Sequence, residues 1–307
     1  MSYNFADPDH KAGNTASSSA ISSQIPSTNI LSKAYIMKID SSSVAFITGG
    51  AAGIGLGIAQ AFAKRGAKLM LADIDQSTLD AAAETLRADG ADVATVVCDV
   101  ADEAQMRAAA QATIDRFGKV HIVVNNAGVA LGGMTGEIDL KDWRWIVDIN
   151  LMGVAHGVEI FTPLIKSHGE GGHIINTASL AGHIAGPGMA PYHATKFAVV
   201  GYSEAMQQEL APADIGVSVL CPAWVKTNIH RSGFNKPTGG GNEEDPQFKE
   251  MSKVIDGGLD PADLGEWTAT CVEDNRLYIF SHPEFAAGID MRYAAVKADY
   301  DAVPFGK

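Results

Sequence analysis

Two residues one helical turn apart, Tyr192 and Lys196, have the types and spacing that acid–base chemistry needs. Apolar residues recur around them at three- and four-residue steps, which predicts a helix from Met189 onward. Residues four apart share a helix face, so the phenol and the ammonium group would project together. A nearby cation favours the phenolate and lowers the tyrosine pKa from its usual value of about 10. We therefore expect Tyr192 to act as an acid–base group.

The Y-x-x-x-K motif alone is short, and its plainest interpretation is a solvated helix face. Ser179 favours the chemical interpretation, because it follows an apolar run, 173–178, that is typical of a buried strand. Its hydroxyl would lie at the C-terminal end of that strand, within reach of a substrate oxygen whose proton Tyr192 moves.

A glycine-rich turn, T-G-G-A-A-G-I-G, begins at Thr48, the last residue of another apolar run. A helical pattern follows it and ends at Gly66. Glycines at a strand-to-helix turn let the backbone approach a pyrophosphate, and the helix N-terminus offers unpaired N–H groups. The turn therefore predicts a dinucleotide site. Its predicted contacts are Gly49, Gly53, Ile54 and Gly55.

Asp73 ends the next predicted strand, 68–72, at the distance typical of a residue that binds the adenosine ribose. A carboxylate there accepts hydrogen bonds from ribose hydroxyls and repels a 2′-phosphate. Neither Ala52 nor Ile74 supplies a positive charge for that phosphate. The sequence therefore favours NAD over NADP. The alternative is that Asp73 only caps the turn into the next helix.

Strands and helices continue to alternate along the chain. Strands are predicted at 93–98 and 120–124, and helices at 77–89 and 102–117. This spacing implies a doubly wound α/β fold, with a parallel sheet and helices on both faces. Ligands in such sheets bind beyond the C-terminal ends of the strands. The polar residues that fall at those ends are Asp73, Asp99 and the run from Asn125 to Gly128.

The second half begins with one long predicted helix, 139–166, that contains Asn150 among apolar residues. A buried amide is ordinarily a satisfied structural group, and that is the first interpretation of Asn150. The polar, glycine-rich stretch 228–259 is interpreted as a flexible lid or substrate loop, with a disordered insertion as the alternative. A helix beginning at Asp260-Pro261 and a final strand at 277–281 complete the pattern.

Composition limits the possible partners. Of the 307 residues, 46% are hydrophobic and 19% charged, as in an ordinary soluble globule. The net charge of −13, without a basic stripe, argues against a nucleic-acid partner. No apolar run approaches the ~20 residues needed to span a bilayer, so no membrane partner is expected. The three cysteines and nine histidines are scattered. We therefore expect neither a disulfide framework nor a metal site, and a cytoplasmic location.

Together, these motifs resemble the short-chain dehydrogenase/reductase (SDR) family from Met37 to about Pro283. The matching pieces are T-G-x-x-x-G-I-G at Thr48–Gly55, Asp73, Asp99, N-N-A-G at Asn125–Gly128, Asn150, Ser179, Y-x-x-x-K at Tyr192–Lys196, and Pro222 with Thr227. The resemblance implies a Rossmann-type doubly wound seven-stranded parallel sheet in a single catalytic domain, 37–285. Residues 1–36 would form a disordered tail and 286–307 a C-terminal extension.

The resemblance also implies a catalytic role for four residues. Tyr192 would be the acid/base, and Lys196 would lower its pKa and hold the nicotinamide ribose. Ser179 would orient the substrate oxygen. Asn150 would hold a water in a proton relay, which would explain its place in an apolar helix.

The remaining family positions imply cofactor contacts. Asp99 would lie near the adenine, and Asn125 and Gly128 near the adenosine. One departure is Ala223 after Pro222, where the family often has glycine. Beyond the glycine turn and Asp73, the implied cofactor contacts are Asp99, Val100, Asn126, Ala127, Gly128, Tyr192, Lys196, Pro222, Val225 and Thr227.

The expected function is NAD-dependent interconversion of a secondary alcohol and a ketone by hydride transfer. An NADPH-dependent ketoreductase is one alternative, and a non-catalytic nucleotide-sensing protein is another. The expected substrate is an apolar or aromatic small molecule, and the family resemblance implies a homodimer or homotetramer. Residues expected to line the substrate pocket are Leu180, Met189, Trp224 and Phe234.

Overall fold

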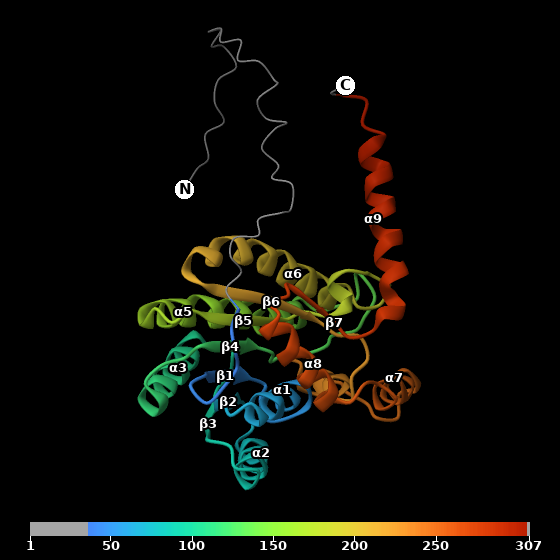
Figure 1. Cartoon of the computed structure of the whole chain (residues 1–307). Coiled ribbons are helices and arrows are strands. Elements are labelled where there is room, and N and C mark those ends of the chain that lie inside the picture. The colour runs from blue at the N-terminus through green and yellow to red at the C-terminus, as the bar shows by residue number, and fades with distance from the viewer. Residues whose placement is uncertain (1–35, 306–307) are drawn as a thin grey trace, which may run out of the picture. The chain divides into compact units, whose positions relative to one another are not determined.

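The computed structural model describes residues 36–305. The predicted disordered tail, 1–36, lies outside these residues except for Ile36. The described chain folds around a seven-stranded parallel sheet with the strand order β3-β2-β1-β4-β5-β6-β7 (Figure 1). The strands are β1 (Val44–Thr48), β2 (Lys68–Asp73), β3 (Val93–Val97), β4 (Ile122–Asn125), β5 (Gly172–Thr177), β6 (Ile215–Cys221) and β7 (Tyr278–Phe280). The predicted doubly wound fold is thereby confirmed.

Helices cover both faces of the sheet. The α-helices are α1 (Gly53–Lys64), α2 (Gln76–Ala88), α3 (Glu103–Phe117), α4 (Leu140–Val147), α5 (Gly153–His168), α6 (Ala190–Leu210), α7 (Pro246–Asp256), α8 (Pro261–Glu273) and α9 (Ala286–Asp301). One buried cluster packs α1, α2 and α8 against the sheet, through residues such as Phe62, Leu79 and Leu264. The other packs α3, α5 and α6, through residues such as Met106 and Phe161.

The central strands are mainly apolar because both of their faces are covered. Every residue of β1, β4, β5 and β6 is buried. The strand order reverses between β1 and β4, which start the two halves of the sheet. Ligands of open α/β sheets bind in the crevice that forms at such a reversal, beyond the strand C-termini.

The predicted long helix 139–166 is interrupted. Helix α4 ends at Val147, a π-helical turn occupies Asp148–Met152, and α5 begins at Gly153. The apolar pattern continues through the turn, so it predicts a single helix where the structure has three segments. Such π-turns are rare and occur frequently at functional sites.

The stretch 228–259 is folded. It contains a 3-10 segment, Ile229–Asn235, followed by α7. The alternative of a disordered insertion is therefore wrong. The C-terminal extension forms helix α9. Within residues 36–305, no helix has both the length and the apolar character needed to cross a bilayer.

Candidate active site

Tyr192 and Lys196 lie in the first two turns of α6, as predicted. The Lys196 Nζ atom is 5.6 Å from the centre of the Tyr192 ring. Lys196 is only 3% exposed, and its Nζ donates a hydrogen bond of 2.9 Å to the carbonyl oxygen of Thr177, the last residue of β5. Burial lowers the pKa of Lys196 to about 8, so the side chain is mainly cationic at neutral pH.

The ionisation of Tyr192 differs from the expectation. Burial raises the pKa of the phenol above its usual value, and a hydrogen bond with Ser179 acts in the opposite direction. The predicted lowering by Lys196 is therefore corrected: desolvation of the phenolate is the dominant effect, and the ammonium group is shared with a backbone carbonyl. In this arrangement the phenol keeps its proton at neutral pH.

Ser179 lies where β5 passes into a short 3-10 turn, Leu180–Gly182, which it caps. Its Oγ accepts a hydrogen bond of 3.1 Å from the Ala181 amide and donates one of 3.3 Å to the carbonyl oxygen of Pro222. The hydroxyl is thus fixed between the ends of β5 and β6. Its proximity to Tyr192, whose phenol pKa it lowers, joins it to the predicted catalytic pair.

Asn150 lies in the π-helical turn and is fully buried. Its Oδ1 accepts from the Val129 amide, and its Nδ2 donates to the Val129 carbonyl, both at 2.8 Å. Nδ2 also lies 3.3 Å from Thr195 Oγ1. A Cβ built on Gly128 would lie 3.3 Å from Asn150 Oδ1 and 3.6 Å from Lys196 Nζ. The amide is therefore a satisfied structural group beside the catalytic lysine, and the water relay remains a prediction.

The glycine turn between β1 and α1 requires its glycines. Gly49 and Gly53 have φ angles of +59° and +51°, in the left-handed region that side chains disfavour. A Cβ on Gly55 would lie 2.1 Å from the Gly49 carbonyl oxygen. Ile54, half-buried, begins the first turn of α1 with Gly55. The turn thus presents bare backbone and a helix N-terminus, as a pyrophosphate requires.

Thr48 and Asn126 fix this turn against the end of β4. Thr48 Oγ1 accepts from the amides of Asn126 and Ala127, at 2.9 and 3.1 Å. The Asn126 Nδ2 donates to the carbonyls of Thr48 and Gly49, at 3.0 and 3.3 Å. Sequence reasoning missed the role of Thr48. The sequence did contain a signal for this role: a threonine hydroxyl at the end of a predicted buried strand, just before the glycine turn.

Asn125 does not face the glycine turn. Its Nδ2 donates to Asn176 Oδ1 at 2.9 Å, and a Cβ on Gly157 of α5 would lie 1.8 Å from its Oδ1. Its side chain therefore belongs to the packing between β4, β5 and α5. Its expected place near the adenosine is corrected, whereas Gly128 lies beside Asn150 and Lys196.

The acidic strand ends fall beside the turn. The Gly50 amide donates to the carbonyl of Ala72 at 3.1 Å, which joins the turn to the end of β2. Burial raises the pKa of Asp73, and backbone amides, including those of Asp75 and Ala51, lower it. After β3, the exposed Asp99 accepts from the Ala101 amide at 2.9 Å. Val100, 6% exposed, packs against Gly153 at the start of α5.

The segment after β6 connects the two halves of the site. The Pro222 carbonyl oxygen accepts from the Leu180 amide at 2.8 Å. Val225 is buried and forms a bridge with Leu259. A Cβ on Gly53 would lie 3.0 Å from Thr227 Cγ2, so Thr227 lies over the glycine turn. The predicted cofactor residues on this segment therefore lie between Ser179 and the turn.

The residues expected to line the substrate pocket lie in different environments. Met189 pairs with Gly133 in an isolated bridge at the start of α6, and Trp224 is 41% exposed. Phe234 instead packs edge-on against Phe248 at 5.4 Å, inside the 228–259 segment.

Asp142 of α4 anchors this segment and was missed by the sequence analysis. Its carboxylate, 2% exposed, accepts from the Thr238 amide at 3.1 Å and the Thr238 hydroxyl at 2.7 Å, and it pairs with Lys236 at 3.3 Å. Burial raises the pKa of Asp142, but these bonds outweigh it and hold the pKa below its usual value. The Ala130 amide adds a bond to Ser232 Oγ at 2.9 Å.

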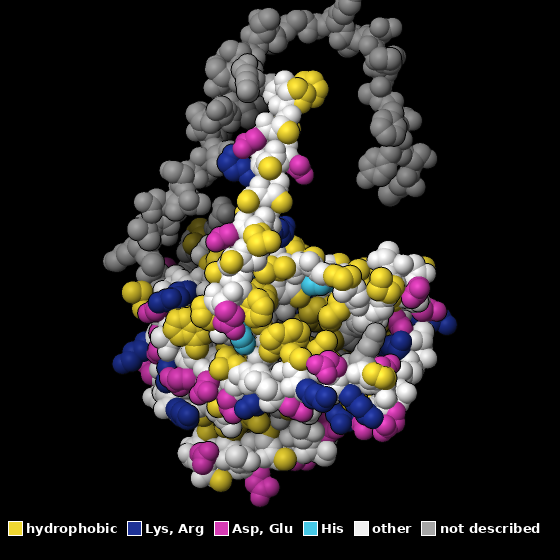
Figure 2. Space-filling model, turned by 90° about the vertical axis from the view of Figure 1, so that its right-hand side faces the viewer, with side chains coloured by type: hydrophobic (Ala, Val, Ile, Leu, Met, Phe, Trp, Pro, Cys, Tyr) yellow, Lys and Arg dark blue, Asp and Glu magenta, His cyan; other side chains and the backbone are white. Residues whose placement is uncertain are grey.

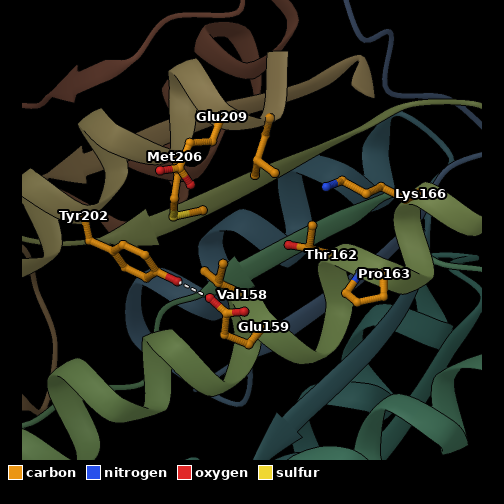
Figure 3. Close-up of a pocket in the computed structure, with 9 residues that line it drawn as sticks. Val158, Glu159, Thr162, Pro163, Lys166, Tyr202, Met206 and Glu209 are labelled. Carbon is orange, nitrogen blue, oxygen red and sulfur yellow. Dashed lines mark hydrogen bonds between the residues drawn. The ribbon is translucent and has the colours of Figure 1, made fainter. Parts of the chain in front are cut away.

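A hollow of about 340 Å³ lies apart from these residues, between the C-terminal halves of α5 and α6 (Figure 3). Tyr202 donates a hydrogen bond of 2.9 Å to Glu159 across it. The hollow holds none of the predicted catalytic or cofactor residues. The other residues that line the hollow are Val158, Thr162, Pro163, Lys166, Met206, Glu209 and Leu210.

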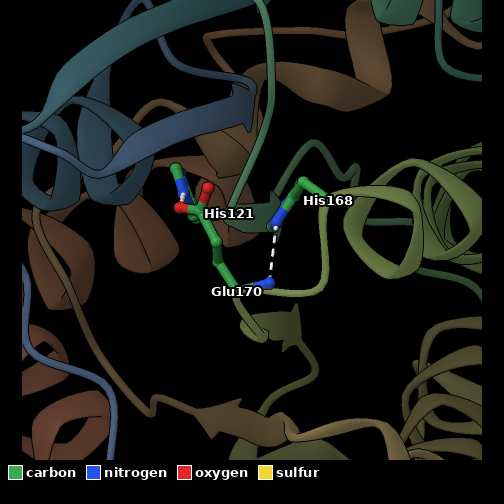
Figure 4. A group of neighbouring side chains, drawn as sticks. All are labelled: His121, His168 and Glu170. Carbon is green, nitrogen blue, oxygen red and sulfur yellow. Dashed lines mark hydrogen bonds and ion pairs between the residues drawn. The ribbon is translucent and has the colours of Figure 1, made fainter.

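His121, His168 and Glu170 form a group beyond the opposite end of the sheet, before β4 and β5 (Figure 4). The His121 Nδ1 accepts from the Val44 amide at 3.0 Å, so Nε2 carries the proton and donates to Glu170 at 3.1 Å. The His168 Nδ1 accepts from the Glu170 amide, and its Nε2 donates to the Val120 carbonyl. Backbone amides thus occupy the lone pair of each imidazole, and the group is a hydrogen-bonded cluster as it stands.

Comparison with known proteins agrees with this geometry. Residues 43–237 match the family model described as short chain dehydrogenase. A CLA biosynthesis dehydrogenase/reductase from Lactiplantibacillus plantarum is 35% identical over 86% of this chain and 96% of its own length. A C alpha-dehydrogenase from Sphingobium sp. is 34% identical over 85% of this chain and 87% of its own.

A solved structure is also similar. The short chain dehydrogenase/reductase of Burkholderia phymatum, crystallised in complex with NAD, is 37% identical, with a TM-score of 0.81 over 89% of this chain and 99% of its own. The family model covers more than half of this chain, and the matching residues include the glycine turn, Asn150, Ser179, Tyr192 and Lys196. The chain belongs to the short-chain dehydrogenase/reductase family of oxidoreductases.

Proposed function

We propose that this protein is an NAD-dependent oxidoreductase that interconverts a secondary alcohol and a ketone. The observation that carries the proposal is the convergence of Ser179, Tyr192 and the Lys196 ammonium group with the end of a glycine-lined turn: Lys196 Nζ lies 5.6 Å from the centre of the Tyr192 ring, and Ser179 lowers the pKa of the phenol. Gly128 directly follows Ala127, whose amide donates a hydrogen bond to Thr48. Gly128 also lies next to Lys196 and Asn150.

The turn fits a dinucleotide, because a side chain at Gly55 would collide with backbone where a pyrophosphate must approach. A bound nicotinamide supplies the hydride acceptor or donor. Tyr192 moves the hydroxyl proton, and Ser179, fixed by the Pro222 carbonyl, orients the reacting oxygen. Lys196 holds a positive charge beside the phenol and is placed to bind the nicotinamide ribose.

Asp73 supports NAD as the cofactor. Its carboxylate lies at the end of β2, joined to the glycine turn through the Gly50–Ala72 hydrogen bond. A 2′-phosphate placed against it would meet like charge. The second candidate, an NADPH-dependent ketoreductase, would require that repulsion to be relieved, and the ratio of kcat/KM values for the two cofactors separates the two functions.

We further propose an apolar or aromatic substrate, since Leu180 and Met189 are only half-buried, Leu180 directly follows Ser179, and Trp224 is 41% exposed. We also propose assembly into a homodimer or homotetramer, as the family resemblance implies. The three cysteines are free and buried, which supports a cytoplasmic location.

The direct test is Tyr192→Phe, assayed by NADH fluorescence over a panel of hydroxysteroids, aromatic alcohols and sugar alcohols. We expect turnover to fall at least ~10²-fold, the usual contribution of a general acid–base group. The affinity for NAD should change little. A variant that kept most of its activity would refute the assignment of Tyr192. A wild-type protein that binds NAD but turns over no alcohol would favour the nucleotide-sensing alternative.

A further inference from the structure

Helix α9 extends away from the rest of the described chain (Figure 1). Its contacts with the body are confined to its first turns. A Cβ on Gly288 would lie 2.7 Å from Ile184 Cδ1, and the Arg292 guanidinium lies 4.9 Å from the centre of the Phe197 ring. In the sequence, Ile184 follows the turn that Ser179 caps, and Phe197 follows Lys196.

The projecting part of α9 carries a stripe of exposed apolar side chains (Figure 2). Tyr293, Val296 and Tyr300 are 53%, 55% and 79% exposed, and Val303, two residues beyond the end of α9 at Asp301, is 48% exposed. They are spaced by three and four residues in alternation, and Ile289 continues the same spacing toward the base. This is the heptad spacing of a helix whose seam packs against another helix.

The charged residues beside this stripe favour one orientation of a second α9 helix. Asp290 and Lys297 flank it on one side, and Arg292 and Asp299 flank it on the other. In a parallel pair of α9 helices, Arg292 of one copy would face Lys297 of the other. In an antiparallel pair, flanking positions of the same side meet, so Arg292 faces Asp299 and Asp290 faces Lys297. Both contacts are then attractive.

We propose that α9 pairs antiparallel with α9 of a second copy of this chain. The register that aligns the opposite charges also places Tyr293 against Val296 and Tyr300 against Ile289 of the other copy. A helix of 16 residues is about 24 Å long, so the end of each helix reaches the base of the other. Each copy therefore brings Tyr300 close to the base of the other copy's α9, where Gly288 lies against Ile184.

The assembly test compares two full-length variants. Val296→Glu places a charge in the middle of the stripe, and Met291→Glu is the matched control, because Met291 is 72% exposed and lies off the stripe. Sedimentation velocity over a concentration series should show Val296→Glu with half the mass of the wild type or less, at concentrations where Met291→Glu is unchanged. Equal masses for all three proteins would overturn the proposal. A wild type that stays monomeric would also overturn it.

The orientation is tested by cross-linking through Ile289→Cys and Tyr300→Cys, made in separate chains. The three native cysteines are buried and should not interfere. Under oxidation, an antiparallel pair should give a disulfide-linked dimer mainly in the mixture of the two variants. If each variant alone formed disulfide-linked dimers and mixing did not increase their amount, the antiparallel arrangement would be contradicted. Neither experiment depends on activity, so both remain decisive if the proposed reaction is wrong.

Discussion

The carboxylate of Asp142 and the hydroxyl of Thr238 are hydrogen-bonded at 2.7 Å across 96 residues of sequence. This contact, with the Thr238 amide and Lys236, ties the 228–259 segment to α4. Because Asp142 is almost fully buried, its bonds are not replaced by water in the closed arrangement. The segment is thus held to α4 by the buried carboxylate of Asp142.

Asp142→Asn should release the 228–259 segment. Removing the charge weakens hydrogen bonds that are worth about 1.5–3 kcal/mol each, so we expect the exposed stretch around Gly240 to be cleaved at least ~10-fold faster by protease. KM should rise while kcat changes less. The control is Asp139→Asn, because asparagine caps α4 as well as the aspartate that accepts from the Lys141 amide. Equal cleavage of both variants would show that Asp142 does not anchor the segment.

Asp73→Ser should shift cofactor preference toward NADP. Removing the carboxylate removes its repulsion of a 2′-phosphate and also hydrogen bonds to the NAD ribose. We expect the ratio of kcat/KM for NAD to that for NADP to fall by ~10-fold or more, about 1.4 kcal/mol or greater. Asp75→Ser is the control: it removes a neighbouring exposed carboxylate and keeps an N-cap for α2. A wild type that prefers NADPH would contradict the role of Asp73.

Lys196→Met should move the pH dependence of turnover. The cation favours the phenolate of Tyr192, so its loss should raise the apparent pKa of the acid–base group and shift kcat/KM toward higher pH. In the wild type, the lysine pKa of about 8 means that the cation itself is lost as the pH rises through that value. We therefore expect kcat/KM to decline above about pH 8. Lys196→Arg, which stays charged, should lack this decline, and identical profiles for all three proteins would exclude the electrostatic role.

Acid should destabilise the fold partly through His173. This residue is fully buried between β5 and β6, where its Nε2 lies 2.8 Å from Ser218 Oγ, and burial lowers its pKa to about 3. Its unfolded pKa of about 6.5 is higher, so its contribution to stability is complete above pH 6.5 and is lost as the pH falls toward 3. The loss is up to about 1.4 kcal/mol per pH unit.

Urea unfolding between pH 4.5 and 7.5 measures this contribution. His173→Gln should lower the stability at pH 7, and its decline with acid should be less steep than that of the wild type by about one proton. Parallel slopes for wild type and His173→Gln would show that protonation of His173 is not linked to unfolding.

The local signals in the sequence predicted most of the fold. Strand β1, the glycine turn and the Asp102 cap of α3 each depend on neighbouring residues, and each occurs as expected. The family resemblance to a seven-stranded parallel sheet is likewise confirmed.

The features that sequence reasoning missed depend on tertiary placement. The Thr48–Asn126 contacts join residues 78 apart, and the raised pKa of Tyr192 comes from burial, which residue spacing does not reveal. Asn125 and Asn126 are neighbours of one type, yet one faces α5 and the other the glycine turn, because successive strand residues point to opposite faces.

The π-helical turn at Asp148–Met152 makes this part of the chain sensitive to length. A regular helix advances about 100° per residue, so deleting one residue here would rotate all of α5 relative to α4 by about that angle. Gly157 would then turn away from Asn125, and the amide of Asn150 would lose the backbone of Val129. Substitutions along α4 and α5 can accumulate while the sheet survives, but the number of residues between Asn150 and Gly157 is fixed by these two packing contacts at once.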